Sequence, residues 1–141
     1  MTTAHDPERE QREIIDEFAL FGDWMERYQY LIDLGKRLPP LADAERVDEH
    51  LLAGCQSRVW LLMDGDDEAM TIRANSDSAI VSGLIALLIR VYSGAAPSRV
   101  LAVEPGFVEA IGLAEHLSPT RSNGLHAMID AIRRKAAELA A

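Results

Sequence analysis

The only cysteine of this 141-residue chain, Cys55, is the side chain with the clearest chemical potential. It stands in the interval Gly54-Cys55-Gln56-Ser57, between two stretches that predict strands. Polar neighbours and a conformationally free glycine predict an exposed bend at this interval. A lone cysteine is more often an inert, buried small hydrophobe, and composition alone leaves that alternative open. The local context instead favours an accessible thiol, which as a thiolate can attack another sulfur atom.

The surroundings of Cys55 predict a nucleophile that depends on a partner. No histidine adjoins it to act as a base, and no second cysteine is present to resolve a disulfide, which disfavours a stand-alone peptidase or reductase. Attack on the outer sulfur of another protein's persulfide requires only an accessible thiolate. Arg58 could stabilise that thiolate modestly, although a solvated strand position is the commoner role for such a residue. The sequence therefore predicts a slow nucleophile that depends on assistance from a partner protein.

Other signatures of catalysis or ligand binding are missing from the sequence. The histidines, at positions 5, 50, 116 and 126, show neither i, i+4 pairing nor clustering with cysteine or aspartate, so no metal site is predicted. The glycines at positions 54, 65 and 83 are isolated, so no phosphate-binding loop is predicted. Carboxylates are plentiful, but no pattern pairs two of them across an apolar cleft. Metal, nucleotide and acid-base chemistry are all disfavoured.

The charge of the chain restricts its partners. The net charge is −9 and the sequence pI is about 4.8, whereas nucleic acids and anionic membranes attract a positive surface. The acidic residues concentrate in residues 8–17 and 64–68, which are expected to be solvated. We therefore expect a protein partner, with neither nucleic acid nor membrane bound.

Targeting signals are also missing. The first ten residues are acidic and contain no apolar segment, so they resemble neither a secretory signal nor a transit peptide. The most apolar stretch, residues 79–89, is much shorter than the roughly 20 residues that cross a bilayer. A single cysteine forms no internal disulfide, which suits a reducing compartment. A cytoplasmic location is predicted.

The coarse pattern of the chain predicts an α+β domain. An amphipathic helix is expected around residues 14–21, and a second one begins after Asp23 as its N-cap and stops near Gly35. Three strands are expected at residues 50–53, 59–63 and 70–74, with the apolar middle strand in the centre of a small antiparallel sheet. An acidic hairpin turn containing Gly65 joins the last two strands.

The second half of the chain predicts helices. A long apolar helix capped by Ser76 or Asp77 should lie across the sheet, and two shorter helices follow near residues 98–103 and 105–113. Ser118 and Pro119 form an N-cap and first position for a final amphipathic helix. Residues 1–141 are predicted to form one domain, with residues 1–10 as a disordered tail.

Four blocks of the sequence resemble one known family. They are GCQSRVW at residues 54–60, WMERY at 24–28 with LIDLGKRLP at 31–39, SDSAIV at 76–81 with GLI at 83–85, and HLSPTRSNGL at 116–125. In order and without large gaps, they are similar to the SufE family of sulfur acceptors in iron-sulfur cluster assembly. The resemblance extends over about residues 13–138, so it is far more specific than the cysteine motif alone.

This resemblance implies a fold and a mechanism. The fold is of the SufE and NifU type, a small antiparallel sheet flanked by helices. A PLP-dependent cysteine desulfurase holds sulfur as its own persulfide, and the family's cysteine, matched by Cys55, accepts that sulfur and passes it to an iron-sulfur scaffold protein. PLP belongs to the partner, and no cofactor is expected on this chain. One cysteine cannot supply the usual four-thiolate ligand set, so no cluster is expected here either.

The resemblance also suggests supporting residues. Gly54, Gln56 and Ser57 form the loop around Cys55, and Arg121 and Asp77 match positions near the surface on which the desulfurase docks. Each of the last two has a simpler explanation: a locally paired first-turn residue for Arg121, and an N-cap for Asp77. An alternative for the whole chain is a noncatalytic adaptor in which Cys55 is only structural.

Overall fold

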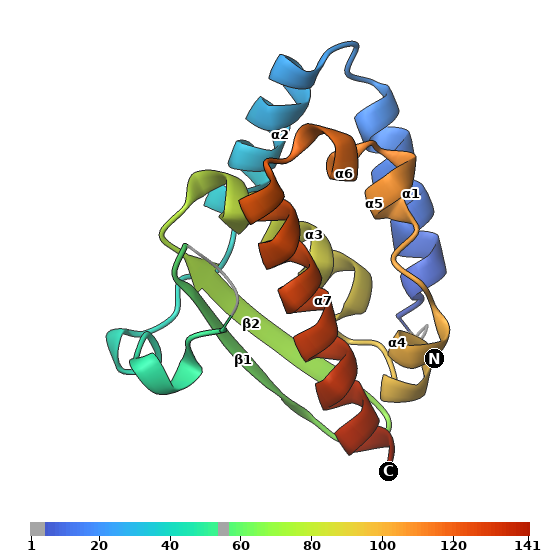
Figure 1. Ribbon diagram of the computed structural model, residues 1–141. Helices are drawn as coiled ribbons and strands as arrows, with labels where there is room; N and C mark the ends of the chain where they lie inside the picture. The colour runs from blue at the N-terminus through green and yellow to red at the C-terminus, as the bar shows by residue number, and fades with distance from the viewer. Residues whose placement is uncertain (1–4, 54–56) are drawn as a thin grey trace.

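The computed structural model describes residues 5–53 and 57–141. Within this part of the chain, seven α-helices and two short 3-10 helices surround a two-stranded antiparallel sheet (Figure 1). The helices are α1 (Pro7–Ala19), α2 (Trp24–Lys36), α3 (Ala79–Tyr92), α4 (Pro97–Ala102), α5 (Phe107–Ala110), α6 (Leu113–His116) and α7 (Pro119–Ala140). The strands are β1 (Val59–Gly65) and β2 (Met70–Ser76), and the 3-10 helices are η1 (Asp43–Glu45) and η2 (Asp48–His50). The predicted α+β class is confirmed.

The sheet is a single hairpin. β1 and β2 pair in a register that sets Val59 opposite Ser76 and Gly65 opposite Met70. Gly65 has φ of +132°, a conformation that favours glycine, and the Asp66 carboxylate accepts hydrogen bonds from two later N–H groups of the turn. The predicted hairpin with a positive-φ glycine is therefore confirmed.

The predicted third strand, at residues 50–53, is wrong. This stretch contributes only an isolated antiparallel bridge between Leu51 and Trp60, because η2 occupies its start. The described sheet consequently has two strands, and β1 is an edge strand instead of the predicted central one. Its continuous apolar sequence predicted a strand with both faces covered. Covered faces do not require a hydrogen-bonded neighbouring strand on both edges.

The hydrophobic core lies on one face of the hairpin. Residues of β2 alternate between buried and exposed, as the sequence predicts for a half-buried strand. α3 packs against β2, as expected. α7 runs beside α3 and contacts β1 (Figure 1). α1 and α2 cover the other side of α3, whose buried residues include Leu84, Leu88 and Tyr92.

The α2–α3 crossing is unusually close because glycines stand at the contact. A Cβ added at Gly83 would lie 2.3 Å from the Leu31 carbonyl oxygen, and one at Gly35 would lie 2.7 Å from the Gly83 nitrogen. Real Cβ atoms essentially never come that near to another atom. The two helix backbones therefore approach each other at a point where only glycine fits.

Two of the three predicted helix caps, Asp23 and Ser118, are confirmed. The Asp23 carboxylate accepts the Glu26 N–H at 2.8 Å, and the Ser118 hydroxyl accepts the Arg121 N–H at 3.3 Å ahead of Pro119. The cap of α3 is different: Ser78 accepts the Val81 N–H, so the prediction of Ser76 or Asp77 as N-cap is wrong.

The N-terminal prediction also needs correction. A disordered tail over residues 1–10 is wrong for residues 7–10, which form the first turn of α1 behind the N-cap Asp6. α1 is held by Gln11, whose side chain donates to the Glu104 carbonyl and accepts the Phe107 N–H, each at 2.9 Å. In the described residues, no helix is long and apolar enough to span a bilayer.

Candidate functional site

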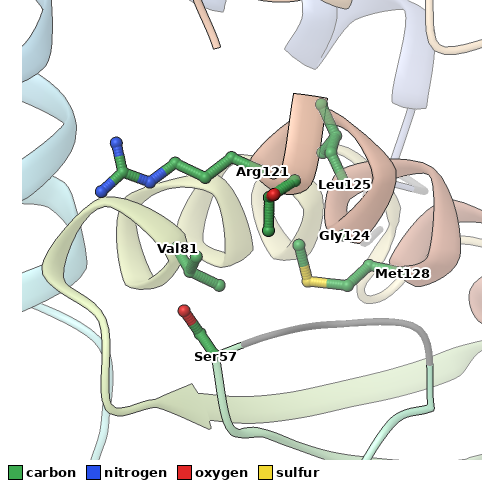
Figure 2. A pocket seen from close by; sticks show the side chains of 7 residues that line it. Ser57, Val81, Arg121, Gly124, Leu125 and Met128 are labelled. Atoms are coloured by element: carbon green, nitrogen blue, oxygen red, sulfur yellow. The ribbon is translucent and has the colours of Figure 1, made fainter. Parts of the chain in front are cut away.

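Ser57 and Arg121 line one small hollow, although the sequence separates them widely. Figure 2 shows the hollow between the chain entering β1, the first turns of α3 and the start of α7. Gly54, Cys55 and Gln56 lie outside the described residues. The structure therefore places two of the predicted supporting residues, Ser57 and Arg121, at one site. Of these, Ser57 directly follows the segment that carries the cysteine.

The wall of this hollow is mostly apolar. Its volume is about 20 Å³, and besides Ser57 and Arg121 it is lined by Val81, Leu125 and Met128, together with Thr120 and Gly124. In Figure 2 the Ser57 hydroxyl points toward Val81, and the Arg121 side chain reaches over the first turn of α3. Leu125 and Met128 are buried, so this surface belongs to the fixed core of the protein. The arrangement combines a rigid apolar wall with an exposed arginine whose side chain extends away over α3.

Arg121 forms no ion pair with any residue that the structure describes. Its side chain is exposed. A cation in the first turn of a helix opposes the helix dipole, so this position does not stabilise α7. The explanation of Arg121 as a locally paired residue is therefore not supported.

Asp77 holds the chain that leads into β1. Its carboxylate accepts the Arg58 N–H at 3.0 Å, and its own N–H donates to the Arg58 carbonyl at 3.3 Å. These two bonds extend the β1–β2 ladder by one pair beyond Val59 and Ser76. Asp77 is thus a clamp on the residue next to Ser57, and its carboxylate has a tertiary role instead of the predicted capping role.

A second, more polar hollow has Asp77 in its lining. It measures about 250 Å³ and is lined by Asp77, Trp60, Ser82 and Arg46 among other residues of the α2–η1 connection and β2. Trp60 therefore faces a different space from the one that Ser57 and Arg121 line. Arg46 pairs with Asp43, so its charge is already compensated.

The start of α7 is positioned by contacts that sequence reasoning missed. The His116 ring stacks on Trp24 with centroids 3.9 Å apart, and the Tyr28 hydroxyl donates to the His116 carbonyl. Arg27 lies over the Trp24 ring and donates to the Ile111 carbonyl at 3.2 Å. These α2 residues fix the turn that precedes Ser118 and hence the orientation of Arg121. Their spacing looked like an ordinary amphipathic face, so no local signal distinguished them.

Charge also holds the helices behind the site. Arg90 of α3 pairs with Glu10 at 3.2 Å, with Glu13 at 3.4 Å and with Glu17, all three on α1. The Arg90 hydrogen bond lowers the pKa of Glu17 below its usual value near 4.5, against the opposing effect of burial. Burial and the Glu17 carboxylate raise the pKa of Tyr30, which donates to the same carboxylate.

Metal-binding geometry is not found in the part of the chain that the structure describes. Across residues 5–53 and 57–141, no group of three or more His, Cys, Asp or Glu side chains is arranged to hold a metal ion. The chemistry available at the described site is that of an apolar recess with one exposed guanidinium.

The architecture matches a solved structure. The solution structure of a hypothetical protein from Thermus thermophilus agrees with a TM-score of 0.75, covering 92% of this chain and 95% of that one at 22% sequence identity. The fold is therefore an established α+β arrangement of helices around a small antiparallel sheet.

Sequence comparison identifies the family. The family model described as SufE, Fe-S metabolism associated domain, matches residues 12–136. Uncharacterized SufE-like proteins of Rhizobium etli and Rhizobium meliloti are 42% and 40% identical over 129 residues, covering 88% of this chain and 87% and 92% of theirs. The chain belongs to the SufE family, which is associated with Fe-S metabolism.

Proposed function

We propose that this protein accepts sulfur on Cys55 from a PLP-dependent cysteine desulfurase and relays it to an iron-sulfur scaffold protein. The observation that carries the proposal is the match of the SufE family model over residues 12–136, which includes the Cys55 segment. The hollow shared by Ser57 and Arg121 supports it, because it adjoins that segment in the chain.

The proposed step is an exchange between sulfur atoms. The Cys55 thiol loses its proton to solvent or to a basic group of the partner, and the thiolate attacks the outer sulfur of the desulfurase persulfide. A new S–S bond forms on Cys55, the old S–S bond breaks, and the desulfurase cysteine leaves as a thiolate. Sulfur moves at an unchanged oxidation level, so the transfer itself needs neither oxidant nor reductant. PLP acts on the desulfurase, where sulfur is first released from free cysteine.

The hollow offers two physical contributions to this step. Its buried wall of Leu125 and Met128 is a place where a weakly hydrated sulfur could be shielded from water and from free thiols. The Arg121 guanidinium forms no ion pair with the described residues, so it is available to a carboxylate of a docking protein, and such pairing is strong and directional. A protein partner would thus supply a carboxylate to pair with the exposed Arg121 guanidinium.

Intact-mass spectrometry tests the proposal. The protein is incubated with a purified cysteine desulfurase and free cysteine, and we expect a mass gain of one or more sulfur atoms that a reductant removes. Cys55→Ser should show no gain, whereas Ser98→Ala, at an exposed position of α4 outside the hollow, keeps the thiol and serves as the matched control. A gain that persists in Cys55→Ser would contradict the proposal.

The same variants separate a relay from an adaptor. If Cys55 is only structural, Cys55→Ser should bind the desulfurase and stimulate it as well as the unchanged protein does. Under the proposed relay, Cys55→Ser still binds but stimulation is lost. Transfer onward is measured by adding a scaffold protein and following the appearance of labelled sulfur on it.

A further inference from the structure

The two edges of the hairpin differ in how many of their outward-facing backbone groups are hydrogen-bonded. On the β2 edge, the Met70 N–H donates to the Ala95 carbonyl at 2.9 Å, and the Met70 carbonyl accepts the Gly94 N–H at 2.7 Å. Further along, the Ile72 N–H donates to the Ser93 hydroxyl at 3.0 Å. The segment after α3 therefore closes this edge.

The β1 edge is closed only at its beginning. The Leu52 N–H donates to the Val59 carbonyl at 2.9 Å, which shows that the main-chain groups of Val59 face away from β2. Because strand residues alternate, the same holds for Leu61, Met63 and Gly65. Within the residues that the structure describes, no backbone hydrogen bond is found for the Leu61 carbonyl, either group of Met63, or the Gly65 N–H.

This open stretch lacks the features that protect edge strands. Natural edges are commonly blocked by lysine, proline or an inward-pointing charge. Residues 61–63 are Leu-Leu-Met, each half-buried, and the first charged side chain of β1 is Asp64 near its end. Figure 1 shows β1 as the strand farther from α3, so this edge faces outward. An apolar strand with unpaired main-chain groups is the kind of edge to which an extended segment adds as another strand.

The charges beside this edge indicate what kind of segment fits. The hairpin turn carries Asp64, Asp66, Asp67 and Glu68, all exposed, and none of them forms an ion pair with the residues described. A strand lying along residues 61–65 would end beside these carboxylates. We propose that the β1 edge is a docking site for an extended segment of a partner protein that alternates apolar side chains and carries lysine or arginine where it passes the turn.

A second copy of this chain fits the edge less well. Each copy has a net charge of −9, so association brings together two strongly acidic molecules. A basic partner segment instead gains from the same charge. The residues that form this docking site, 61–65 and the acidic turn, do not include the Cys55 segment, and the proposal does not rest on the proposed sulfur transfer.

Amide hydrogen exchange on the full-length protein tests the docking site. The probe is the peptide acetyl-Lys-Val-Thr-Val-Thr-Lys-amide, titrated to millimolar concentration and followed by NMR. We expect exchange of the Met63 and Gly65 amides to slow by about tenfold at saturation, since each gains a hydrogen bond. The Leu62 amide faces β2 and should change little. An analogue in which both lysines are replaced by glutamate should bind much more weakly.

Two sets of variants complete the test. Met63→Pro removes the outward N–H, which an edge position tolerates, and should weaken peptide binding about tenfold, while Met63→Leu keeps the N–H and should bind within about twofold. If Met63→Pro does not fold, the Asp67→Lys, Glu68→Lys double variant should still weaken binding about tenfold through charge alone. Unchanged exchange at Met63 and Gly65, equal binding of the glutamate peptide, or protection that grows with protein concentration without peptide would overturn the proposal.

Discussion

Asp77 and Arg58 are joined by two reciprocal hydrogen bonds at the point where the chain enters β1. The Asp77 carboxylate accepts the Arg58 N–H at 3.0 Å, and the Asp77 N–H donates to the Arg58 carbonyl at 3.3 Å. Of these bonds only the first depends on the side chain of residue 77. Substitution there therefore tests how firmly the residues beside Ser57 are held.

We predict that Asp77→Ala releases the Arg58 amide. Loss of one charge-assisted hydrogen bond at an exposed site should lower the free energy of unfolding by only about 1 kcal/mol. The segment around Arg58 should open locally more often, although global stability changes little. The Arg58 amide should therefore exchange its hydrogen faster by NMR, while the Ile72 amide should change little. Asp77→Asn keeps an acceptor oxygen and should show an intermediate rate. Equal rates in all three proteins would mean that the carboxylate contributes nothing to the clamp.

The close α2–α3 crossing predicts that a larger residue at Gly83 destabilises the protein. Gly83→Ala places a methyl group against the Leu31 carbonyl, so the helices must separate. Even after the roughly 1 kcal/mol that alanine gains over glycine within a helix, we expect a net loss of about 1–3 kcal/mol in the free energy of unfolding. Chemical denaturation measures it. Gly22→Ala is the matched control, because a Cβ there meets nothing within 4 Å.

The pH dependence of stability should reveal the Arg90–Glu17 pair. Arg90 lowers the pKa of Glu17 in the folded state, so the unfolded chain takes up a proton on this residue first as the pH falls. The stabilisation is present above the unfolded pKa and is lost as the pH falls through the folded one. Unfolding free energies measured from pH 7 to pH 3 should therefore fall less steeply below about pH 4.5 for Glu17→Gln than for the unchanged protein. Ser98→Ala, at an exposed position that carries no titratable group, should keep the original slope.

The sequence predicted features that local chemistry determines. Asp23 and Ser118 are N-caps, and Gly65 takes its positive φ, because each depends on residues within one turn. Asp77 was misjudged because its carboxylate bonds to Arg58, and no local rule anticipates a partner that far back in the chain. Residues 50–53 failed as a strand for a similar reason, since their pairing depends on how far the 3-10 helix before them extends.

The candidate site likewise has features that the sequence predicts and features that depend on tertiary packing. The reactivity of Cys55 and its loop is a prediction from motif and family, and it falls on residues outside the described part of the chain. That Ser57 and Arg121 line one hollow could not be predicted from composition or periodicity, because only the packing of α7 beside α3 brings them together. The anchoring of His116 by Trp24 and Tyr28 is likewise a tertiary contact.

Arg121 provides the most direct test of partner recognition. Its guanidinium is exposed and forms no ion pair within the described chain, so Arg121→Ala should change the free energy of unfolding by less than about 0.5 kcal/mol. If the cation pairs with a carboxylate of the desulfurase, the same variant should bind that enzyme about tenfold to a hundredfold more weakly, as expected when one partner of an interfacial charge pair is lost. Binding is measured by calorimetry and stimulation by the rate of sulfide release. Arg134→Ala, which removes an exposed arginine from the far end of α7, should leave both unchanged. A lower stability of Arg121→Ala with unaltered binding would instead assign this residue a role within the fold.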